Sequence, residues 1–212
     1  MKLSRRGVLL LPTIIGLNSM MTTTPRAQTN NSHSILKNPT GIALAVKDKL
    51  TFITNAHSLN DENKVEFYNQ RVEQEFSPRE MSIPHPNLDI AIFKLQRPQN
   101  LLTPFQVSEM PIQIGKEYRA ILNNQSYTIP IYTKTQVPNN KGDNYEVYEG
   151  YALPVDIVYQ GLSGSPILDS NDEVVGFITG EYKKPIKSKG KMYQTPLITN
   201  LGGLEQLMQN KK

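Results

Sequence analysis

The sequence predicts an all-β fold, and three observations carry this prediction. From Thr40 onward, short apolar runs of strand length alternate with turn residues, a pattern typical of a β-barrel or a β-sandwich. Helical spacing of apolar residues is nearly confined to the end of the chain, where a short C-terminal helix over 201–212 is expected. The 212 residues suit a single domain, and a hydrophobic content of 38% is enough for a core.

The first strands form an expected hairpin. Residues 41–46 and 50–54 are apolar runs separated by the charged segment 47–49, which is typical of a turn. The apolar pattern lapses between Pro98 and Pro111, so we expect this stretch to connect two halves of the domain. The other strands are expected at 64–68, 71–75, 89–95, 117–123, 126–136, 144–153, 165–169, 173–180 and 192–198.

Residues 1–27 have the composition of a signal peptide. Basic residues at the start precede an apolar run, Gly7 to Leu17, that is shorter than the roughly 20 residues needed to span a bilayer. The segment from Ser4 to Leu9 resembles a twin-arginine export signal, and an ordinary secretory signal is the alternative. We therefore expect export to a bacterial periplasm or to the medium, with no stable membrane span once the signal is removed. The polar stretch 28–38 is expected to be a flexible lead-in.

The charge distribution argues against a nucleic-acid partner. The chain carries 23 Lys and Arg against 19 Asp and Glu, a net charge of +4. Four of the basic residues and none of the acidic ones lie in residues 1–27, so the remainder of the chain is balanced. Binding to nucleic acid depends on clustered cations that displace counterions from phosphate.

Metal and thiol chemistry find little support in the composition. The chain has no cysteine, which excludes disulfides, thiolate nucleophiles and Cys-based zinc sites. Its three histidines stand apart in sequence, and no HExxH segment is present. We therefore expect no metal and no cofactor.

Three separated segments carry candidate chemistry. TNAH at 54–57 follows an apolar strand, Asp89 opens another, and GLSGSP at 161–166 precedes a third. Each has an ordinary structural reading by itself: a histidine at a strand end, an aspartate capping a strand, a tight glycine turn. A carboxylate that enters a buried strand must, however, be paired or hydrogen-bonded.

Taken together, the segments predict a catalytic triad of His57, Asp89 and Ser163. Serine is a weak nucleophile unless a base removes its proton, and a third group must fix the orientation of that base. The order His, Asp, Ser along the chain is the chymotrypsin order. Small residues around Ser163 let backbone N–H groups converge, and those of Gly161 and Ser163 are the expected oxyanion-hole donors.

These segments resemble the trypsin-like peptidase superfamily, most closely the bacterial HtrA/DegP-type protease domain. TNAH at 54–57, DIAI at 89–92 and GLSGSP at 161–166 match its three signatures, and the resemblance covers the chain from about residue 35. It implies two six-stranded antiparallel β-barrels with the active site between them. The first barrel is then expected over 39–100 and the second over 111–200, within a protease domain spanning 39–212.

The sequence departs from the family pattern in two places. The trypsin motif has an aspartate before the nucleophile, which pairs with a new N-terminus after zymogen cleavage, and HtrA proteins usually have asparagine there. This chain has Leu162, so activation by N-terminal insertion is not expected. The sequence also leaves no room after the protease domain for the PDZ domain of HtrA proteins, so chaperone and cage functions are not carried over.

The resemblance also suggests where substrate binds. The expected binding residues are Ile157, Ile178, Thr179 and Gly180. No acid stands six residues before Ser163, so we expect an apolar or small residue before the scissile bond. The basic run over 183–191 is expected to be a solvated hairpin loop, with a basic rim that attracts acidic substrate segments as the alternative.

The sequence thus predicts a secreted serine endopeptidase that acts on protein or peptide substrates through an acyl-enzyme. The alternative is a catalytically latent protease-fold module that binds peptides or a partner protein by strand addition. An esterase would use the same chemistry on another acyl bond. The oligomeric state is left open.

Overall fold

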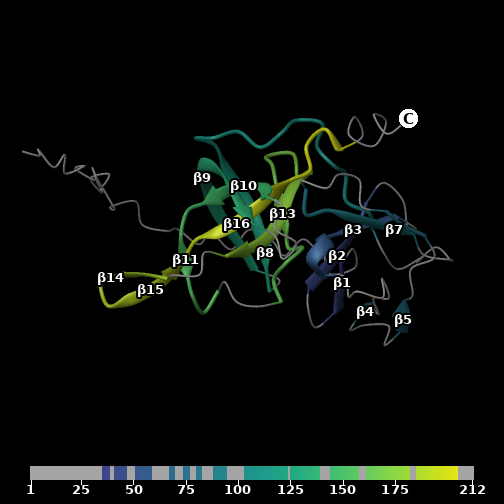
Figure 1. The fold of residues 1–212 in the computed structure, drawn as a ribbon, viewed down its shortest axis with the longest axis horizontal. Coiled ribbons are helices and arrows are strands. Elements are labelled where there is room, and N and C mark those ends of the chain that lie inside the picture. Colours follow the sequence, from purple (N-terminus) through teal and green to yellow (C-terminus); the bar gives the residue numbers. More distant parts are fainter. Residues whose placement is uncertain are drawn as a thin grey trace, which may run out of the picture.

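The structure is a computed structural model, and its strands divide into two β-rich halves and a small third sheet (Figure 1). The described residues are 35–38, 41–46, 51–58, 67–69, 74–76, 80–82, 88–94, 103–123, 125–138, 144–157, 161–181 and 185–204. The expected signal peptide, 1–27, and most of the expected C-terminal helix, 201–212, lie outside these residues. In the described part of the chain no helix has the length and hydrophobicity to cross a membrane.

The first half is one antiparallel sheet of seven strands in the order β5-β4-β1-β2-β3-β7-β6. Its backbone pairing brings β3 between β2 and β7, so the segment that follows β3 lies next to the start of β7. Phe52 and Phe93 are directly opposed across β3 and β7, and their rings stack with centroids 5.4 Å apart. The strands are β1 (Ile35–Asn38), β2 (Gly41–Ala45), β3 (Thr51–Thr54), β4 (Phe67–Asn69), β5 (Gln74–Phe76), β6 (Glu80–Ser82) and β7 (Ala91–Lys94).

Two features of this half differ from the sequence prediction. Residues 35–38, expected to belong to a flexible lead-in, form β1, because their backbone pairs with β2 and at Lys37 with β4. A six-stranded barrel was expected over 39–100, and the described residues of this half form a seven-stranded sheet. Strand β6, like β1, was not expected from the sequence, and it is added by antiparallel backbone pairing to the edge of β7 opposite β3.

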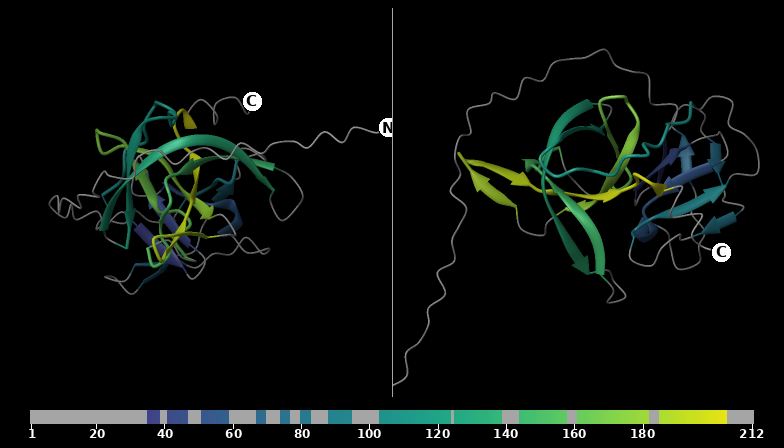
Figure 2. Two further views of the ribbon diagram at one scale, coloured as in Figure 1. Left: turned by 90° about the vertical axis from the view of Figure 1, so that its left-hand side faces the viewer. Right: turned by 90° about the horizontal axis from the view of Figure 1, so that it is seen from above.

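The second half is a closed barrel of six strands in the order β10-β16-β13-β12-β8-β9, as expected (Figure 2). Alternation along β8 buries Tyr118, Ala120 and Leu122, which face the barrel interior together with Ile129 and Ile131 of β9. The strands are β8 (Glu117–Leu122), β9 (Gln125–Pro138), β10 (Asn144–Gly150), β12 (Pro166–Leu168), β13 (Val174–Glu181) and β16 (Pro196–Asn200).

A second hydrophobic cluster joins the two halves. It contains Ile53 and Ile92 from the first sheet and Leu168 and Phe177 from the barrel, all buried. The connecting segment expected between Pro98 and Pro111 is described from residue 103. It passes between the halves, with Phe105 donating its N–H to Ala45 at 2.9 Å. The cluster fixes the position of the first sheet against the barrel.

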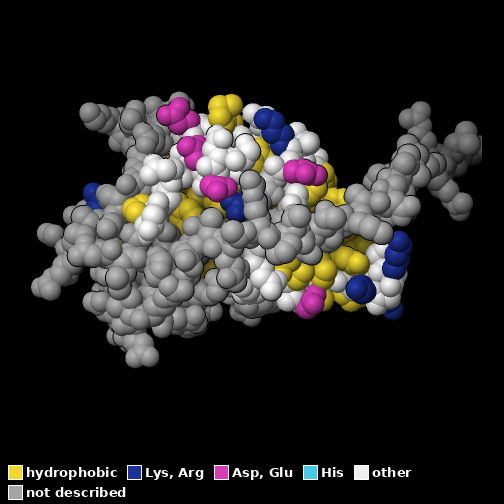
Figure 3. Space-filling model, turned by 180° about the vertical axis from the view of Figure 1, so that it is seen from behind, with side chains coloured by type: hydrophobic (Ala, Val, Ile, Leu, Met, Phe, Trp, Pro, Cys, Tyr) yellow, Lys and Arg dark blue, Asp and Glu magenta, His cyan; other side chains and the backbone are white. Residues whose placement is uncertain are grey.

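A small three-stranded sheet extends from the barrel. It consists of β11 (Leu153–Pro154), β15 (Lys191–Gln194) and β14 (Ile186–Ser188), in that order. Three lysines of the basic run, Lys187, Lys189 and Lys191, are exposed on this hairpin. Figure 3 shows lysines beside hydrophobic side chains at this end of the molecule. Lys183 and Lys184 lie outside the described residues.

Candidate active site

The position of His57 follows from the end of strand β3. Residues Phe52 to Thr54 are buried, and the Thr54 hydroxyl donates to the Ile42 carbonyl at 2.8 Å, which fixes the end of the strand to β2. The chain then turns through a single 3-10 turn, η2 (Ala56–Ser58), in which the Ser58 N–H donates to the Asn55 carbonyl at 3.1 Å. This turn brings the His57 ring to the junction between the halves, where 37% of its side chain is exposed.

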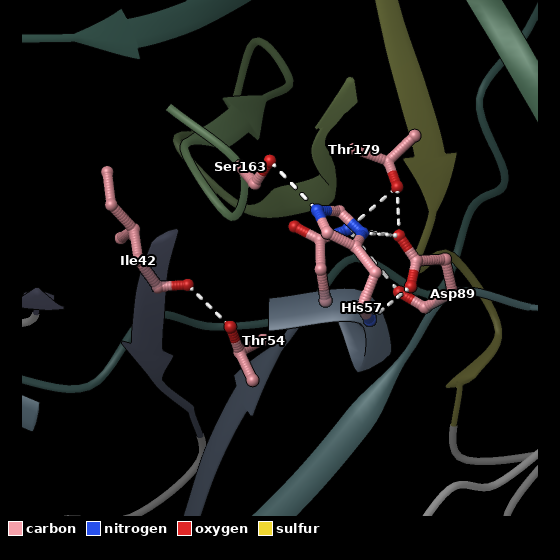
Figure 4. A network of polar contacts seen from close by, with 7 residues as sticks. Ile42, Thr54, His57, Asp89, Ser163 and Thr179 are labelled. Atoms are coloured by element: carbon pink, nitrogen blue, oxygen red, sulfur yellow. Dashed lines mark hydrogen bonds and ion pairs between the residues drawn. The ribbon is translucent and has the colours of Figure 1, made fainter. Parts of the chain in front are cut away.

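Asp89 lies two residues before β7, and its side chain is 1% exposed. Its Oδ1 accepts the His57 backbone N–H at 2.9 Å, and its Oδ2 is 2.5 Å from His57 Nδ1 (Figure 4). The Asn55 amide donates to Oδ2 at 2.9 Å, and the Thr179 hydroxyl donates to the same oxygen. A buried carboxylate with four hydrogen-bond donors is well stabilised as an anion.

The pKa of Asp89 reflects two opposing effects. Burial by itself raises the pKa of the carboxyl, because it disfavours the charged form. The hydrogen bond and charge of the His57 ring, followed by the Thr179 hydroxyl and the His57 backbone N–H, outweigh burial, and the pKa of Asp89 is lowered. Asp89 is therefore ionised near neutral pH.

The other ring nitrogen of His57 faces the candidate nucleophile. His57 Nε2 lies 3.1 Å from Ser163 Oγ. Because the ionised Asp89 accepts a proton from Nδ1, the neutral imidazole has its lone pair on Nε2, and the Ser163 hydroxyl donates to it. The three residues are thus joined in one chain of hydrogen bonds that begins in the first sheet and ends in the barrel.

The loop that holds Ser163 is fastened to both halves. The Ile42 N–H donates to the Ser163 carbonyl at 2.7 Å, and the Gly164 N–H donates to the Ile178 carbonyl at 2.7 Å. Gly164 has φ of +88°, and an added β-carbon would lie 1.9 Å from the Ile42 carbonyl oxygen, so only glycine fits at this position.

The backbone before Ser163 is also shaped by glycine. Gly161 has φ of +96°, a conformation that residues with a β-carbon rarely adopt. Among the residues that the structure describes, neither the Gly161 N–H nor the Ser163 N–H has a hydrogen-bond acceptor.

The expected substrate-binding residues occupy different environments. Ile178 is 2% exposed, and Ile157 is partly buried; both pack on the barrel core, so their side chains contact protein in this structure. Thr179 is partly exposed, and its hydroxyl contacts Asp89 and Asn55. Gly180 is partly exposed, and a β-carbon built there would meet nothing within 4 Å.

Sequence reasoning did not assign Asn55 and Thr179 as partners of Asp89. Asn55 stood inside the recognised TNAH segment, so a signal was present, but its role depends on where β7 and β13 lie. Thr179 is a polar residue that follows the apolar residues Phe177 and Ile178 in β13. The pairing of β13 with β16 shifts register between Ile178 and Gly180, and such a bulge changes the direction of the side chain it carries.

No metal site emerges in the described part of the chain, where no three His, Cys, Asp or Glu residues gather closely enough to hold an ion. Of the charged surface pairs, Lys134 of β9 pairs with Glu146 of β10 at 2.6 Å, and Arg119 of β8 pairs with Asp172 in the turn before β13.

Comparison with solved structures shows the same fold. The chain superposes on the Rv3671c protease of Mycobacterium tuberculosis in its active form with a TM-score of 0.57 at 20% identity, covering 85% of this chain and 81% of that one. The inactive form gives 0.57 at 19% identity, with 85% and 90% covered. The MamO protease domain of Magnetospirillum magneticum gives 0.61 at 13% identity, with 85% and 98% covered.

A search of curated proteins gave no match. The model of the trypsin-like peptidase domain matches residues 40–177, which is more than half of the chain and includes His57, Asp89 and Ser163. The fold, the match and the resemblance of the three segments agree: this chain belongs to the trypsin-like peptidase family.

Proposed function

We propose that this peptidase is an exported serine endopeptidase that cleaves peptide bonds through a covalent acyl-enzyme. The observation that carries the proposal is the continuous chain from Asp89 Oδ2 to His57 Nδ1 at 2.5 Å and from His57 Nε2 to Ser163 Oγ at 3.1 Å. Nucleophile, base and orienting group lie within hydrogen-bond reach of one another, the arrangement that activates a serine hydroxyl.

In the first step, Ser163 Oγ attacks the carbonyl carbon of the scissile peptide bond as its proton passes to His57 Nε2. His57 is then a cation, and the buried anion of Asp89 stabilises it without taking the proton. The tetrahedral intermediate collapses when His57 gives its proton to the leaving amine, which departs and leaves an ester on Ser163. Water then attacks this ester with His57 again as base, releasing the acid and restoring the serine.

The oxyanion of both intermediates would be held by the N–H groups of Gly161 and Ser163. Neither group has an acceptor among the described residues, and the positive φ of Gly161 is what turns its peptide unit at this point. Removing one such donor in related chemistry costs about 3–4 kcal/mol of transition-state stabilisation.

The substrate is proposed to be a protein or peptide with an apolar or small residue before the scissile bond. Preference for Lys or Arg at that position needs a buried carboxylate in the pocket, and Asp156, the described acid nearest to Ile157 in sequence, is exposed. The open space at Gly180 allows a peptide backbone to approach strand β13 closely.

Export is proposed from residues 1–27 alone. Their basic start and short apolar run support removal of a signal peptide and action in a periplasm or outside the cell. Expression of the full chain with its signal, followed by N-terminal sequencing of the protein recovered outside the cytoplasm, tests this part.

The catalytic proposal is tested by labelling the purified chain with a fluorophosphonate probe, which reacts only with an activated serine. Wild type and Ser165→Ala are expected to label, and Ser163→Ala is not. Ser165 is a suitable control because it lies two residues away and its Oγ is buried with no partner among the described residues. Absence of label on folded wild type would instead favour a latent module that binds peptides without cutting them.

A further inference from the structure

Asn55, in the TNAH segment, contacts two residues outside that segment, Asp89 and Thr179. It lies between β3 and η2, is fully buried, and its Nδ2 is 2.9 Å from Asp89 Oδ2 and 2.8 Å from Thr179 Oγ1. A third acceptor, the Asp89 carbonyl, lies at 3.4 Å. The amide has two N–H hydrogens, and it donates both to Asp89 or to the Thr179 hydroxyl, which is itself hydrogen-bonded to Asp89.

The orientation of this amide is determined by its neighbours. If its oxygen and nitrogen were exchanged, the carbonyl oxygen would face the Asp89 carboxylate, and two acceptors would repel each other. With the nitrogen toward Asp89, the amide oxygen is buried and has no partner among the described residues. Burying an oxygen in this way disfavours folding, so packing alone gives no reason for asparagine here rather than an apolar side chain of similar size.

The hydroxyl of Thr179 depends on the same amide. Because its oxygen accepts an Asn55 N–H, its own hydrogen is directed to Asp89 Oδ2. Three donors therefore converge on Oδ2: His57 Nδ1, the Asn55 amide and the Thr179 hydroxyl. An oxygen that accepts three hydrogen bonds is a weaker base, which keeps the shared proton on the imidazole.

We infer that Asn55 is a positioning residue: its amide fixes the Asp89 carboxylate, directly and through the Thr179 hydroxyl, in the orientation that directs the lone pair of His57 Nε2 at Ser163. This inference rests on the proposed function, since orientation of the base matters for activity only if His57 acts as one. Asn55 touches no reacting atom, and its effect is exerted through Asp89.

The direct test uses Asn55→Ala and Asn55→Asp in the full chain. Asn55→Ala removes both donors and is expected to lower kcat by about 10- to 100-fold with KM changed less than about twofold, because substrate binding does not involve this side chain. Asn200→Ala is the matched control, since the Asn200 amide binds backbone groups of Ile112 and Gly202 instead. Asn200→Ala is expected to change thermal stability but to leave kcat unchanged when kcat is normalised to the amount of enzyme that fluorophosphonate labels at Ser163.

Asn55→Asp keeps the shape of the side chain and replaces the donor by an acid. In the described part of the chain, Asp89 is the charged group in contact with His57. The new carboxyl group takes the place of an amide 2.9 Å from Asp89 Oδ2, and two carboxylates this close cannot both be ionised, so the pair retains one proton, which the new group donates to Asp89. Loss of this proton at higher pH places two repelling anions beside His57, so the alkaline limb of kcat/KM is expected to move to lower pH. A purely structural asparagine would leave this limb in place.

Coupling to Thr179 gives a second measurement. Thr179→Val removes the hydroxyl with little change of shape. Because part of the Asn55 effect passes through that hydroxyl, the loss of kcat in the double variant with Asn55→Ala is expected to be smaller than the product of the two single losses. Losses that multiply would overturn the relay through Thr179.

A readout independent of turnover separates failure of this inference from failure of the proposed function. Nuclear magnetic resonance of the labelled His57 ring reports whether the proton stays on Nδ1 and at which pH the ring titrates. If wild type does not react with fluorophosphonate, the proposed function fails, but Asn55→Ala should still disturb the Nδ1 proton signal. An unchanged ring signal and pH limb in both Asn55 variants, with stability lowered as in Asn200→Ala, would overturn the inference.

Discussion

Substitution of Gly164 by alanine tests how the active-site loop is held against the first sheet. Gly164 follows Ser163 directly and has φ of +88°. Its α-carbon stands over the backbone of Ile42, and the Ile42 N–H donates to the Ser163 carbonyl at 2.7 Å. A β-carbon would lie 1.9 Å from the Ile42 carbonyl oxygen, where contacts under 3.0 Å essentially never occur. The loop or β2 must therefore move by about 1 Å.

The size of the effect follows from two contributions. A left-handed backbone costs a residue with a β-carbon about 1–2 kcal/mol. Movement of the loop also breaks or weakens the Ile42–Ser163 hydrogen bond, worth about 0.5–1.5 kcal/mol, before any strain in β2 is counted. For a chain of this size, a total near 3 kcal/mol lowers Tm by about 6–12 °C. A shift of about 1 Å at the nucleophile is expected to slow its reaction by about 100-fold.

Gly115→Ala is the matched control. Gly115 has φ of +85°, but nothing lies within 4 Å of an added β-carbon, so this variant reports the backbone strain alone. We expect its Tm to fall by about 2–8 °C and its rate of fluorophosphonate labelling to stay unchanged. Both variants are compared by thermal denaturation and by labelling of the folded fraction. Equal Tm and equal labelling for Gly164→Ala and Gly115→Ala would refute the argument from contact with Ile42.

Three further predictions use other parts of the structure. Asp89→Asn should lower kcat/KM by about 10³–10⁴-fold, as for other triad aspartates. The stabilisation that comes from the lowered pKa of Asp89 is present above about pH 4 and is lost as pH falls through the folded-state pKa. The free energy of unfolding, measured by denaturant titration from pH 5 to 3, should therefore fall less in Asp89→Asn than in wild type. Thr199→Val should raise Tm by about 2–4 °C, because the Thr199 hydroxyl is buried without a partner among the described residues; a lower Tm would contradict this. Leu162→Ala and Ile129→Ala both empty part of the barrel core and should each cost about 2–5 kcal/mol in denaturant titration. Only Leu162→Ala should also slow labelling of the folded fraction, by about 10-fold, because Leu162 lies beside Ser163.

The residues of the candidate triad could be predicted because each lies in a short segment with a recognisable local pattern. His57 follows a buried strand, Asp89 precedes one, and Ser163 is enclosed by glycines, so each position could be found without knowledge of distant contacts. The strands of the second barrel were predictable from apolar runs, because inward and outward residues alternate along strands such as β8, whereas their number and closure into a barrel were expected from the family resemblance.

Features that depend on pairing between distant strands could not be predicted. Strand β1 forms in a polar stretch because β2 and β4 supply backbone partners. The contact of Thr179 with Asp89 joins residues 90 positions apart and involves a register shift in β13 that no residue pattern announces. The family resemblance suggested substrate binding for Thr179, which stays a prediction, and the structure adds the contact of its hydroxyl with Asp89.

Leu162 shows how a departure from the family pattern is accommodated. An aspartate at this position would be held by an ion pair, but the Leu162 side chain is 4% exposed and packs in the barrel core with Ile167 and Ile178. The N–H of Gly164 donates to the Ile178 carbonyl and the Ser165 N–H to the Leu162 carbonyl, so backbone bonds close the turn around Ser163. Apolar packing and these bonds persist as long as the barrel is folded. The described residues thus hold this loop, with Ser163 Oγ 3.1 Å from His57 Nε2, without a charged side chain at position 162.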